Sequence, residues 1–137
     1  MANINWLSVL VGGVAYFFLG YIWYTFLFGR TWGRALGMNP DAANKEEMQR
    51  EMMKLLPWSF LANLVAAAFV ALLVSYAHAN GDAMRAAKVG AVAGLGIAGS
   101  TMFMHYNWLK KSKTAWAIDI GYAMLGCGLA GWIIGAM

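Results

Sequence analysis

The sequence predicts an all-α fold, an integral membrane bundle of four transmembrane helices, and three observations support this. Four apolar stretches, at about residues 4–28, 58–77, 86–108 and 116–137, cover most of the 137 residues. A helix rises about 1.5 Å per residue, so about 20 residues cross a hydrocarbon core of about 30 Å. Only 12% of the residues are charged, against about 25% in soluble domains. The basic residues stand at the ends of the apolar stretches.

Composition also limits the class of protein. We expect residues 1–137 to form a single transmembrane domain, because the connections leave no room for a second one. A formal net charge of +4 is compatible with a nucleic-acid partner, but membrane topology explains basic residues at helix ends better. The expected partner is therefore the lipid bilayer and not nucleic acid. The single cysteine, Cys127, excludes an intrachain disulfide and is interpreted as a packing residue.

The first apolar stretch is interpreted as a retained helix rather than a signal peptide. Residues 1–3 carry no Lys or Arg, the apolar run is too long, and no convincing small-x-small cleavage site follows it.

The connection between the first two spans is too long for a simple turn and predicts an amphipathic helix. Asn39, Pro40 and Asp41 form a typical helix start, with a cap, a proline at the first position and an acid near the positive end of the dipole. Apolar and charged residues then separate at helical spacing. The apolar ones are Met48, Met52 and Leu55, and the charged ones are Glu46, Glu47, Arg50 and Lys54.

Two interpretations of this helix stay open. It lies on the cytoplasmic membrane surface between the first and second spans, or it is a solvated connector whose apolar side packs on the bundle. In both, Pro57 lets the chain turn into the second span.

The third and fourth spans are rich in glycine. Gly90 and Gly94, and likewise Gly131 and Gly135, show the GxxxG spacing that lets two helices approach closely in lipid. Such faces serve packing within a bundle more often than association between chains. Self-association into a homo-oligomer nevertheless remains an expectation for so small a chain.

The distribution of basic residues predicts the orientation. The first and third connections hold eight basic residues and the second holds two. The eight are Arg30, Arg34, Lys45, Arg50, Lys54, Lys110, Lys111 and Lys113, and the two are Arg85 and Lys88. Because short cytoplasmic loops carry an excess of Lys and Arg, the sequence predicts a multi-pass protein of the bacterial inner membrane with both termini outside the cytoplasm.

Polar side chains occur at similar depth in all four spans, on the predicted cytoplasmic side. These residues are Trp23 and Tyr24 in the first span, Asn63 in the second, His105 in the third, and Asp119 and Tyr122 in the fourth. A carboxylate at the centre of a membrane helix costs at least about 2.5–3.5 kcal/mol, so it should face the bundle. The functional hypothesis is an ion or proton site, with Asp119 titrating and His105 as its charge partner. The alternative is a network that only fixes helix packing.

The sequence favours neither a metal site nor an enzyme. Met102, Met104 and His105 are ligands that suit copper(I), but their positions on a helix point in different directions. No nucleophile–base pair, phosphate-binding loop or zinc spacing occurs. We therefore expect no metal, no cofactor and no catalytic residue.

The chain resembles a family of small bacterial four-helix membrane proteins known only as a domain of unknown function. The similarity covers the whole length and rests on three motifs: Asn5-Trp6-Leu7, then Trp23-Tyr24 with Phe28-Gly29 and Trp32, then Ile118-Asp119-Ile120-Gly121-Tyr122. The resemblance implies an integral membrane protein and no known activity. Two functions therefore stay open: a homo-oligomeric ion- or proton-linked transport or channel protein, or an accessory or structural subunit of a larger membrane complex.

Overall fold

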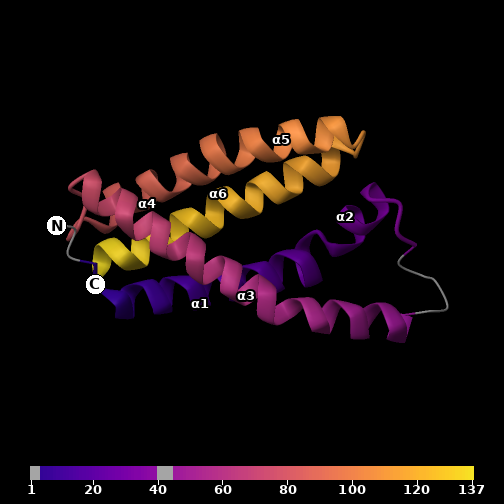
Figure 1. Ribbon diagram of the computed structural model, residues 1–137, viewed down its shortest axis with the longest axis horizontal. Helices are drawn as coiled ribbons and strands as arrows, with labels where there is room; N and C mark the ends of the chain where they lie inside the picture. Colours follow the sequence, from indigo (N-terminus) through magenta and orange to yellow (C-terminus); the bar gives the residue numbers. More distant parts are fainter. Residues whose placement is uncertain (1–3, 40–44) are drawn as a thin grey trace.

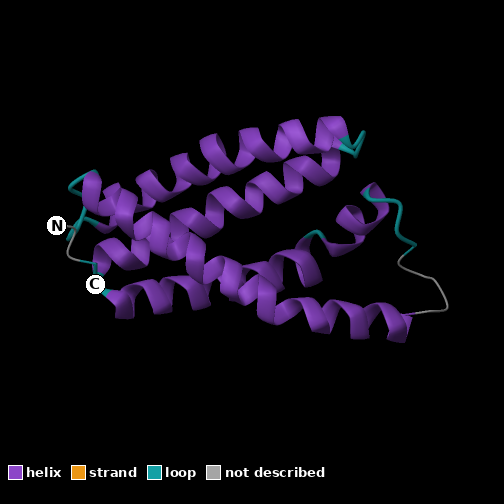
Figure 2. Cartoon of the chain, in the orientation of Figure 1, coloured by secondary structure: helices purple, strands orange, loops and turns teal. Residues whose placement is uncertain are grey.

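The computed structural model describes residues 4–39 and 45–137, and the ordered elements in these ranges are all helical (Figure 2). In chain order they are α1 (Trp6–Ile22), η1 (Trp23–Leu27), α2 (Gly29–Ala35), α3 (Lys45–Tyr76), α4 (Ala83–Ala93), η2 (Gly94–Ala98), α5 (Gly99–Trp108) and α6 (Lys113–Ala136). The elements η1 and η2 are single turns of π-helix: η1 ends the rod that α1 begins, and η2 joins α4 to α5 within one rod. The all-α class is confirmed.

Four rods are long and apolar enough to cross a membrane: Trp6–Leu27, Glu46–Tyr76, Ala83–Trp108 and Lys113–Ala136. They match the four predicted apolar helices. The start of α1, the end of α6 and the α3–α4 turn lie at one end of the bundle, and α2 and the α5–α6 turn lie at the other (Figure 1). The bulk of the basic residues belong to this second end, which we call the basic end.

Side-chain caps fix where three of the helices begin. The Asn5 side chain accepts from the Leu7 and Ser8 amides, Asp82 from the Arg85 amide, and Ser112 from the Thr114 amide. Each cap satisfies an amide that has no partner inside its own helix.

The helix α6 is central and packs against α1, α3, α4, η2 and α5. Its contact with α4 is made by backbone rather than by large side chains. A Cβ at Gly90 or Gly131 would overlap a carbonyl oxygen of the opposite helix, that of Cys127 or of Ala86. One at Gly94 would lie 2.5 Å from the Ala123 carbonyl oxygen, and one at Gly135 would lie 2.9 Å from that of Asp82. Both GxxxG pairs therefore serve packing within the chain.

The connection between the first two spans differs from the prediction. Residues 45–76 form one continuous helix, α3, with Pro57 inside it. The predicted separate surface helix ending in a turn at Pro57 is therefore wrong. An interior proline removes one helical hydrogen bond, and strong helix formers on both sides, such as Met52, Lys54, Leu55 and Leu61, maintain the helix.

Two further features of this connection were not as expected. Of the proposed start at Asn39, Pro40 and Asp41, Asn39 lies outside any helix, and the other two lie outside the described residues. The short helix α2 was not predicted. It ends where the amides of Gly37 and Met38 donate back to the carbonyls of Arg34 and Gly33, with Gly37 at a φ of +80°. Glycine adopts this left-handed conformation at no steric cost.

The π turns change which residues face α6. A π turn contains one residue more than an α turn, so it rotates the following helix face. Across η2, Gly94 and Gly99 both lie against α6 although they are five positions apart: a Cβ at Gly99 would overlap the side chain of Ile120. The rod α4–η2–α5 thereby follows α6 along most of its length.

Candidate functional site

The carboxylate of Asp119 is the centre of a polar cluster inside the bundle, toward the basic end. Its Oδ1 accepts a hydrogen bond from the Tyr24 hydroxyl at 2.6 Å, and its Oδ2 accepts one from the Tyr106 hydroxyl. Tyr24 belongs to η1 and Tyr106 to α5, so three rods meet at this group. Among the described residues the only ion pair joins Lys54 and Glu51, so the half-buried Asp119 has hydroxyl partners but no cation.

Tyr122 extends the cluster to the fourth rod. Asn63 of α3 donates from Nδ2 to the Tyr122 hydroxyl oxygen at 3.0 Å. That hydroxyl lies 3.4 Å from the Tyr16 carbonyl oxygen and 3.3 Å from Asn63 Oδ1, either of which it can donate to. The Tyr122 ring meets Tyr16 and Tyr24, with centroids 5.0 and 5.3 Å apart. Hydrogen bonds and ring contacts thus link all four rods in one layer.

Two indole hydrogen bonds join neighbouring rods to α6, one from Trp23 of η1 and one between Trp116 of α6 and α5. The Trp23 Nε1–H donates to the Ile118 carbonyl at 3.1 Å, and the Trp116 Nε1–H donates to the Gly99 carbonyl at 3.2 Å. Gly121 leaves room for the Trp23 ring, which would lie 3.1 Å from a Cβ there.

The π turn η1 explains how two adjacent residues reach the same helix. Consecutive residues of an α-helix point about 100° apart, yet Trp23 and Tyr24 both bond to α6. They lie in the wider turn, which often occurs at functional sites. The motif Ile118–Tyr122 supplies the groups that these residues contact. The Ile118 carbonyl accepts from Trp23, and the Asp119 carboxylate accepts from Tyr24. Gly121 leaves space for the Trp23 ring, and the Tyr122 hydroxyl accepts from Asn63.

Of the six residues predicted for the layer, the structure brings five together: Trp23, Tyr24, Asn63, Asp119 and Tyr122. It leaves out His105, whose side chain is exposed, and Tyr106 takes its place beside Asp119. A regular helix would place His105 on the α6 face, because it lies eleven residues after Gly94, about three turns of 3.6 residues. Because the π turn η2 contains one additional residue, the position that faces α6 is Tyr106 and not His105.

Tyr16 was also missed. It is buried, its ring lies where a side chain at Gly126 would be, and the Cys127 thiol lies 3.8 Å from its hydroxyl. Gly20 and Trp23 follow Tyr16 by four and seven positions, so all three lie on the same helix face. Helical periodicity could therefore have identified Tyr16 from the sequence.

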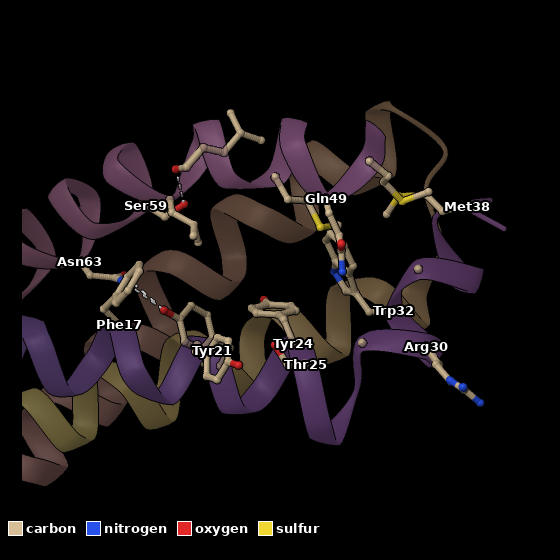
Figure 3. A pocket seen from close by; sticks show the side chains of 18 of the residues that line it. Phe17, Tyr21, Tyr24, Thr25, Arg30, Trp32, Met38, Gln49, Ser59 and Asn63 are labelled. Atoms are coloured by element: carbon tan, nitrogen blue, oxygen red, sulfur yellow. Dashed lines mark hydrogen bonds between the residues drawn. The ribbon is translucent and has the colours of Figure 1, made fainter. Parts of the chain in front are cut away.

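A cavity of about 850 Å³ reaches the layer from the basic end. It lies between α1, η1 and α2 on one side and the first half of α3 on the other (Figure 3). Tyr24, Asn63 and Tyr122 line its inner part. Tyr24 therefore has two contacts, with the cavity through its ring and with Asp119 through its hydroxyl. The described residues contain no group of three His, Cys, Asp or Glu side chains that could hold a metal ion.

Comparison with known proteins gives one match. A family model described as "Protein of unknown function (DUF1761)" matches residues 7–135, a range that includes the whole cluster and the cavity lining. No curated protein matches the chain, and no solved structure does.

Proposed function

The chain belongs to the DUF1761 family of proteins of unknown function, and we propose that it is a small ion- or proton-linked transport protein of the bacterial inner membrane. In this proposal the basic end faces the cytoplasm, both termini lie outside, and Asp119 is the group that binds the proton or cation.

The observation that carries this proposal is the setting of Asp119. Both of its oxygens accept from tyrosine hydroxyls, and no cation among the described residues neutralises it. Ionisable groups inside transmembrane segments are costly and mark ion or proton pathways. The other five acidic residues, Asp41, Glu46, Glu47, Glu51 and Asp82, lie outside the apolar part of the spans.

The shape of the bundle favours a site with access from one side. The cavity reaches Tyr24 and Tyr122 from the basic end. Beyond this layer, small and apolar residues fill the interior, among them Val74, Ala67 and Ala130, which are fully buried. In this proposal a proton or small cation that arrives through the cavity reaches Asp119 past Tyr24, which lines the inner part of the cavity and donates its hydroxyl to the carboxylate.

We propose that the working form is a homo-oligomer, since four helices alone enclose little aqueous volume. Because both GxxxG pairs lie inside the chain, its contacts would use the exposed apolar outer faces, where Phe18, Phe69 and Ile97 lie. The alternative is an accessory subunit, in which a larger partner covers the same faces. Mass measurement after gentle detergent extraction separates the two: a discrete homo-oligomer supports transport, and a fixed larger partner supports the accessory role.

The transport proposal is tested in proteoliposomes with a pH-sensitive dye in the lumen and an imposed potential. We expect Asp119→Asn to abolish proton or cation flux while the protein inserts and purifies like the wild type. Glu47→Gln is the matched control, because Glu47 is exposed and lies outside the layer, and it should leave flux unchanged. Flux in Asp119→Asn equal to that of the wild type would refute the proposal.

Orientation is tested by labelling single cysteines in intact cells, in a Cys127→Ala background. Asn80→Cys lies in the α3–α4 turn and Lys111→Cys in the α5–α6 turn, and both positions are exposed. An impermeant maleimide should label Asn80→Cys alone. Labelling of Lys111→Cys alone would reverse the orientation.

A further inference from the structure

Each oxygen of the Asp119 carboxylate has a donor directed at it. The Tyr24 hydroxyl of η1 donates to Oδ1 at 2.6 Å, and the Tyr106 hydroxyl of α5 donates to Oδ2. An ionised carboxylate only accepts, whereas a phenol both donates and accepts. The carboxylate is thus surrounded by the positive ends of two O–H dipoles. This arrangement stabilises the anion itself and opposes a metal cation beside it.

Two backbone carbonyl oxygens of the layer also have side-chain donors. The Ile118 carbonyl accepts from the Trp23 indole, and the Gly99 carbonyl accepts from the Trp116 indole. Membrane proteins that bind Na⁺ or K⁺ instead direct backbone carbonyls at the ion, where they replace its water shell. The layer therefore uses for indole donors the type of ligand that such an ion requires.

Few oxygen atoms remain for a metal ion in the described part of the layer. The Tyr122 hydroxyl can donate to the Tyr16 carbonyl at 3.4 Å or to Asn63 Oδ1 at 3.3 Å, so one of these two acceptors is left without this donor. Together with the carboxylate oxygens, this is well short of the about six to eight oxygen ligands of Ca²⁺ or the about six of Mg²⁺. A proton needs a single lone pair.

The other titratable groups around Asp119 do not neutralise it. On α6 the Tyr122 ring meets the rings of Tyr24 and of Tyr16 of α1. Among the described residues the only ion pair joins two side chains of α3, Lys54 and Glu51. The charged or basic groups of the remaining neighbouring elements are exposed: Arg30 and Arg34 of α2, Arg85 and Lys88 of α4, and His105 of α5. The charge of the carboxylate is therefore removed by what it binds.

From these observations we propose that the species bound at Asp119 is a proton and not a metal cation, and that Tyr24 and Tyr106 determine this selectivity. The inference rests on the proposed transport function and extends it, because it names the bound species and two selectivity-determining residues. The phenols oppose a metal cation because both hold O–H groups against the carboxylate. They admit a proton because a phenol oxygen can accept from the acid that forms.

Proton binding forms one bond. The proton adds to a lone pair of Oδ1, the oxygen bonded to Tyr24, because Tyr24 lines the cavity. The carboxylate becomes a neutral carboxylic acid, Tyr24 turns its hydrogen away, and the Tyr24 oxygen accepts from the new O–H group. Tyr106 continues to donate to Oδ2. Release breaks the same O–H bond and returns Tyr24 to its role as a donor.

Selectivity is tested first by flux. Proteoliposomes with a pH-sensitive dye in the lumen receive a pH gradient, with thiocyanate as the permeant counter-ion and choline, Na⁺ or K⁺ as the other cation. We expect equal rates of luminal pH change in all three media. Flux that requires Na⁺ or K⁺ would overturn the inference and leave the transport proposal standing. Flux in none of the media would refute transport, and proton binding is then decided by the next measurement.

Infrared difference spectroscopy detects the bound proton without transport. Acidification of the purified protein should produce a carboxylic acid C=O band in the wild type that Asp119→Asn lacks, and subtraction of the two spectra removes the other acidic residues. The band should be the same in Na⁺, K⁺ and choline at constant pH. No difference between the two proteins, or loss of the band when Na⁺ replaces choline, would overturn the inference.

The role of the phenols is tested by exposing one carboxylate oxygen. Tyr106→Phe removes the donor to Oδ2 and keeps the ring. Na⁺ should then suppress the acid band at a concentration about tenfold lower than in the wild type, the factor that corresponds to one hydrogen bond to a charged group. Tyr76→Phe is the matched control, because Tyr76 ends α3 and is 75% exposed, and it should behave like the wild type.

Tyr24→Phe gives the same readout at Oδ1 if Tyr106→Phe does not fold. Na⁺ sensitivity equal to that of the wild type in both variants would show that the phenols do not determine selectivity, and would refute that part of the inference. Equal Na⁺ sensitivity in Tyr106→Phe and Tyr76→Phe would do the same.

Discussion

The two sides of α6 show two ways of packing helices. On one side α4 lies so close that glycines such as Gly90 and Gly131 place one helix against carbonyl oxygens of the other. Toward the basic end on the other side, α1, η1 and α2 stand apart from the first half of α3, and long side chains surround a cavity. The Asp119 carboxylate lies between the two regions.

The difference assigns separate roles to the two regions. Where small residues meet, dispersion contacts and close backbone approach hold helices together in lipid, and α6 is held as a fixed wall. Where the helices part, the interior is open to a molecule from outside. A binding site at Asp119 requires both regions. The close contact between α4 and α6 holds the carboxylate in place, and the cavity beside α3 gives a bound species access to it.

The largest effect is expected from adding a methyl group between α4 and α6. In Gly90→Ala the new Cβ would overlap the Cys127 carbonyl oxygen, and the backbone cannot move without displacing α6. We expect a loss of about 3 kcal/mol of unfolding free energy, the upper part of the usual range for overpacking. SDS titration followed by tryptophan fluorescence measures it.

Gly96→Ala is the matched control. Gly96 lies in the same rod, and a Cβ there would meet no atom within 4 Å. Alanine should leave stability unchanged or raise it by up to about 1 kcal/mol through helix propensity. Equal losses for both variants would show that general helix properties, and not contact with α6, determine the effect.

A smaller effect is expected where α5 meets the polar cluster. Tyr106→Phe removes the hydroxyl that donates to Asp119 and should cost about 1.5 kcal/mol, the lower part of the range for hydrogen bonds to charged groups. His105→Ala should change stability by no more than about 0.5 kcal/mol, because its side chain is exposed. The same titration compares them. A larger loss in His105→Ala would reinstate the histidine as the partner of the carboxylate.

This pair of residues shows how far sequence analysis can reach. The depth of a residue in a helical span is counted from the end of the span, so an error of one residue changes it little. This count correctly placed Asp119, Tyr24 and Asn63 at one level. Rotation about the helix axis accumulates residue by residue, and one additional residue in η2 transferred the contact from His105 to Tyr106. Nothing in the residues 94–98 distinguishes a π turn from an α turn, because the neighbouring helix α6 provides the contacts that stabilise it.

The connection between the first two spans illustrates a second limit. Pro57 was interpreted as the end of a surface helix, whereas α3 continues through it. Local rules treat a proline as a boundary, but the helical segments before and after Pro57 share one face in this bundle, and that contact is not visible in the local sequence. Met52 and Leu56 before the proline, and Ser59 and Asn63 after it, line the same cavity.

The smallest effect is expected at the cavity wall. Leu56 lines the cavity and is 44% exposed, so truncation removes few contacts and leaves no new enclosed void. Leu56→Ala should change the unfolding free energy by less than about 0.5 kcal/mol, as is usual for surface positions. Leu64→Ala is the comparison, because Leu64 packs on Gly13 at the closed end of the α1–α3 contact and should cost at least about 1 kcal/mol more, as core truncations do. If Leu56→Ala were as destabilising as Leu64→Ala, the first half of α3 would be packed as tightly as the rest, and the contrast between a closed and an open side of α6 would be lost.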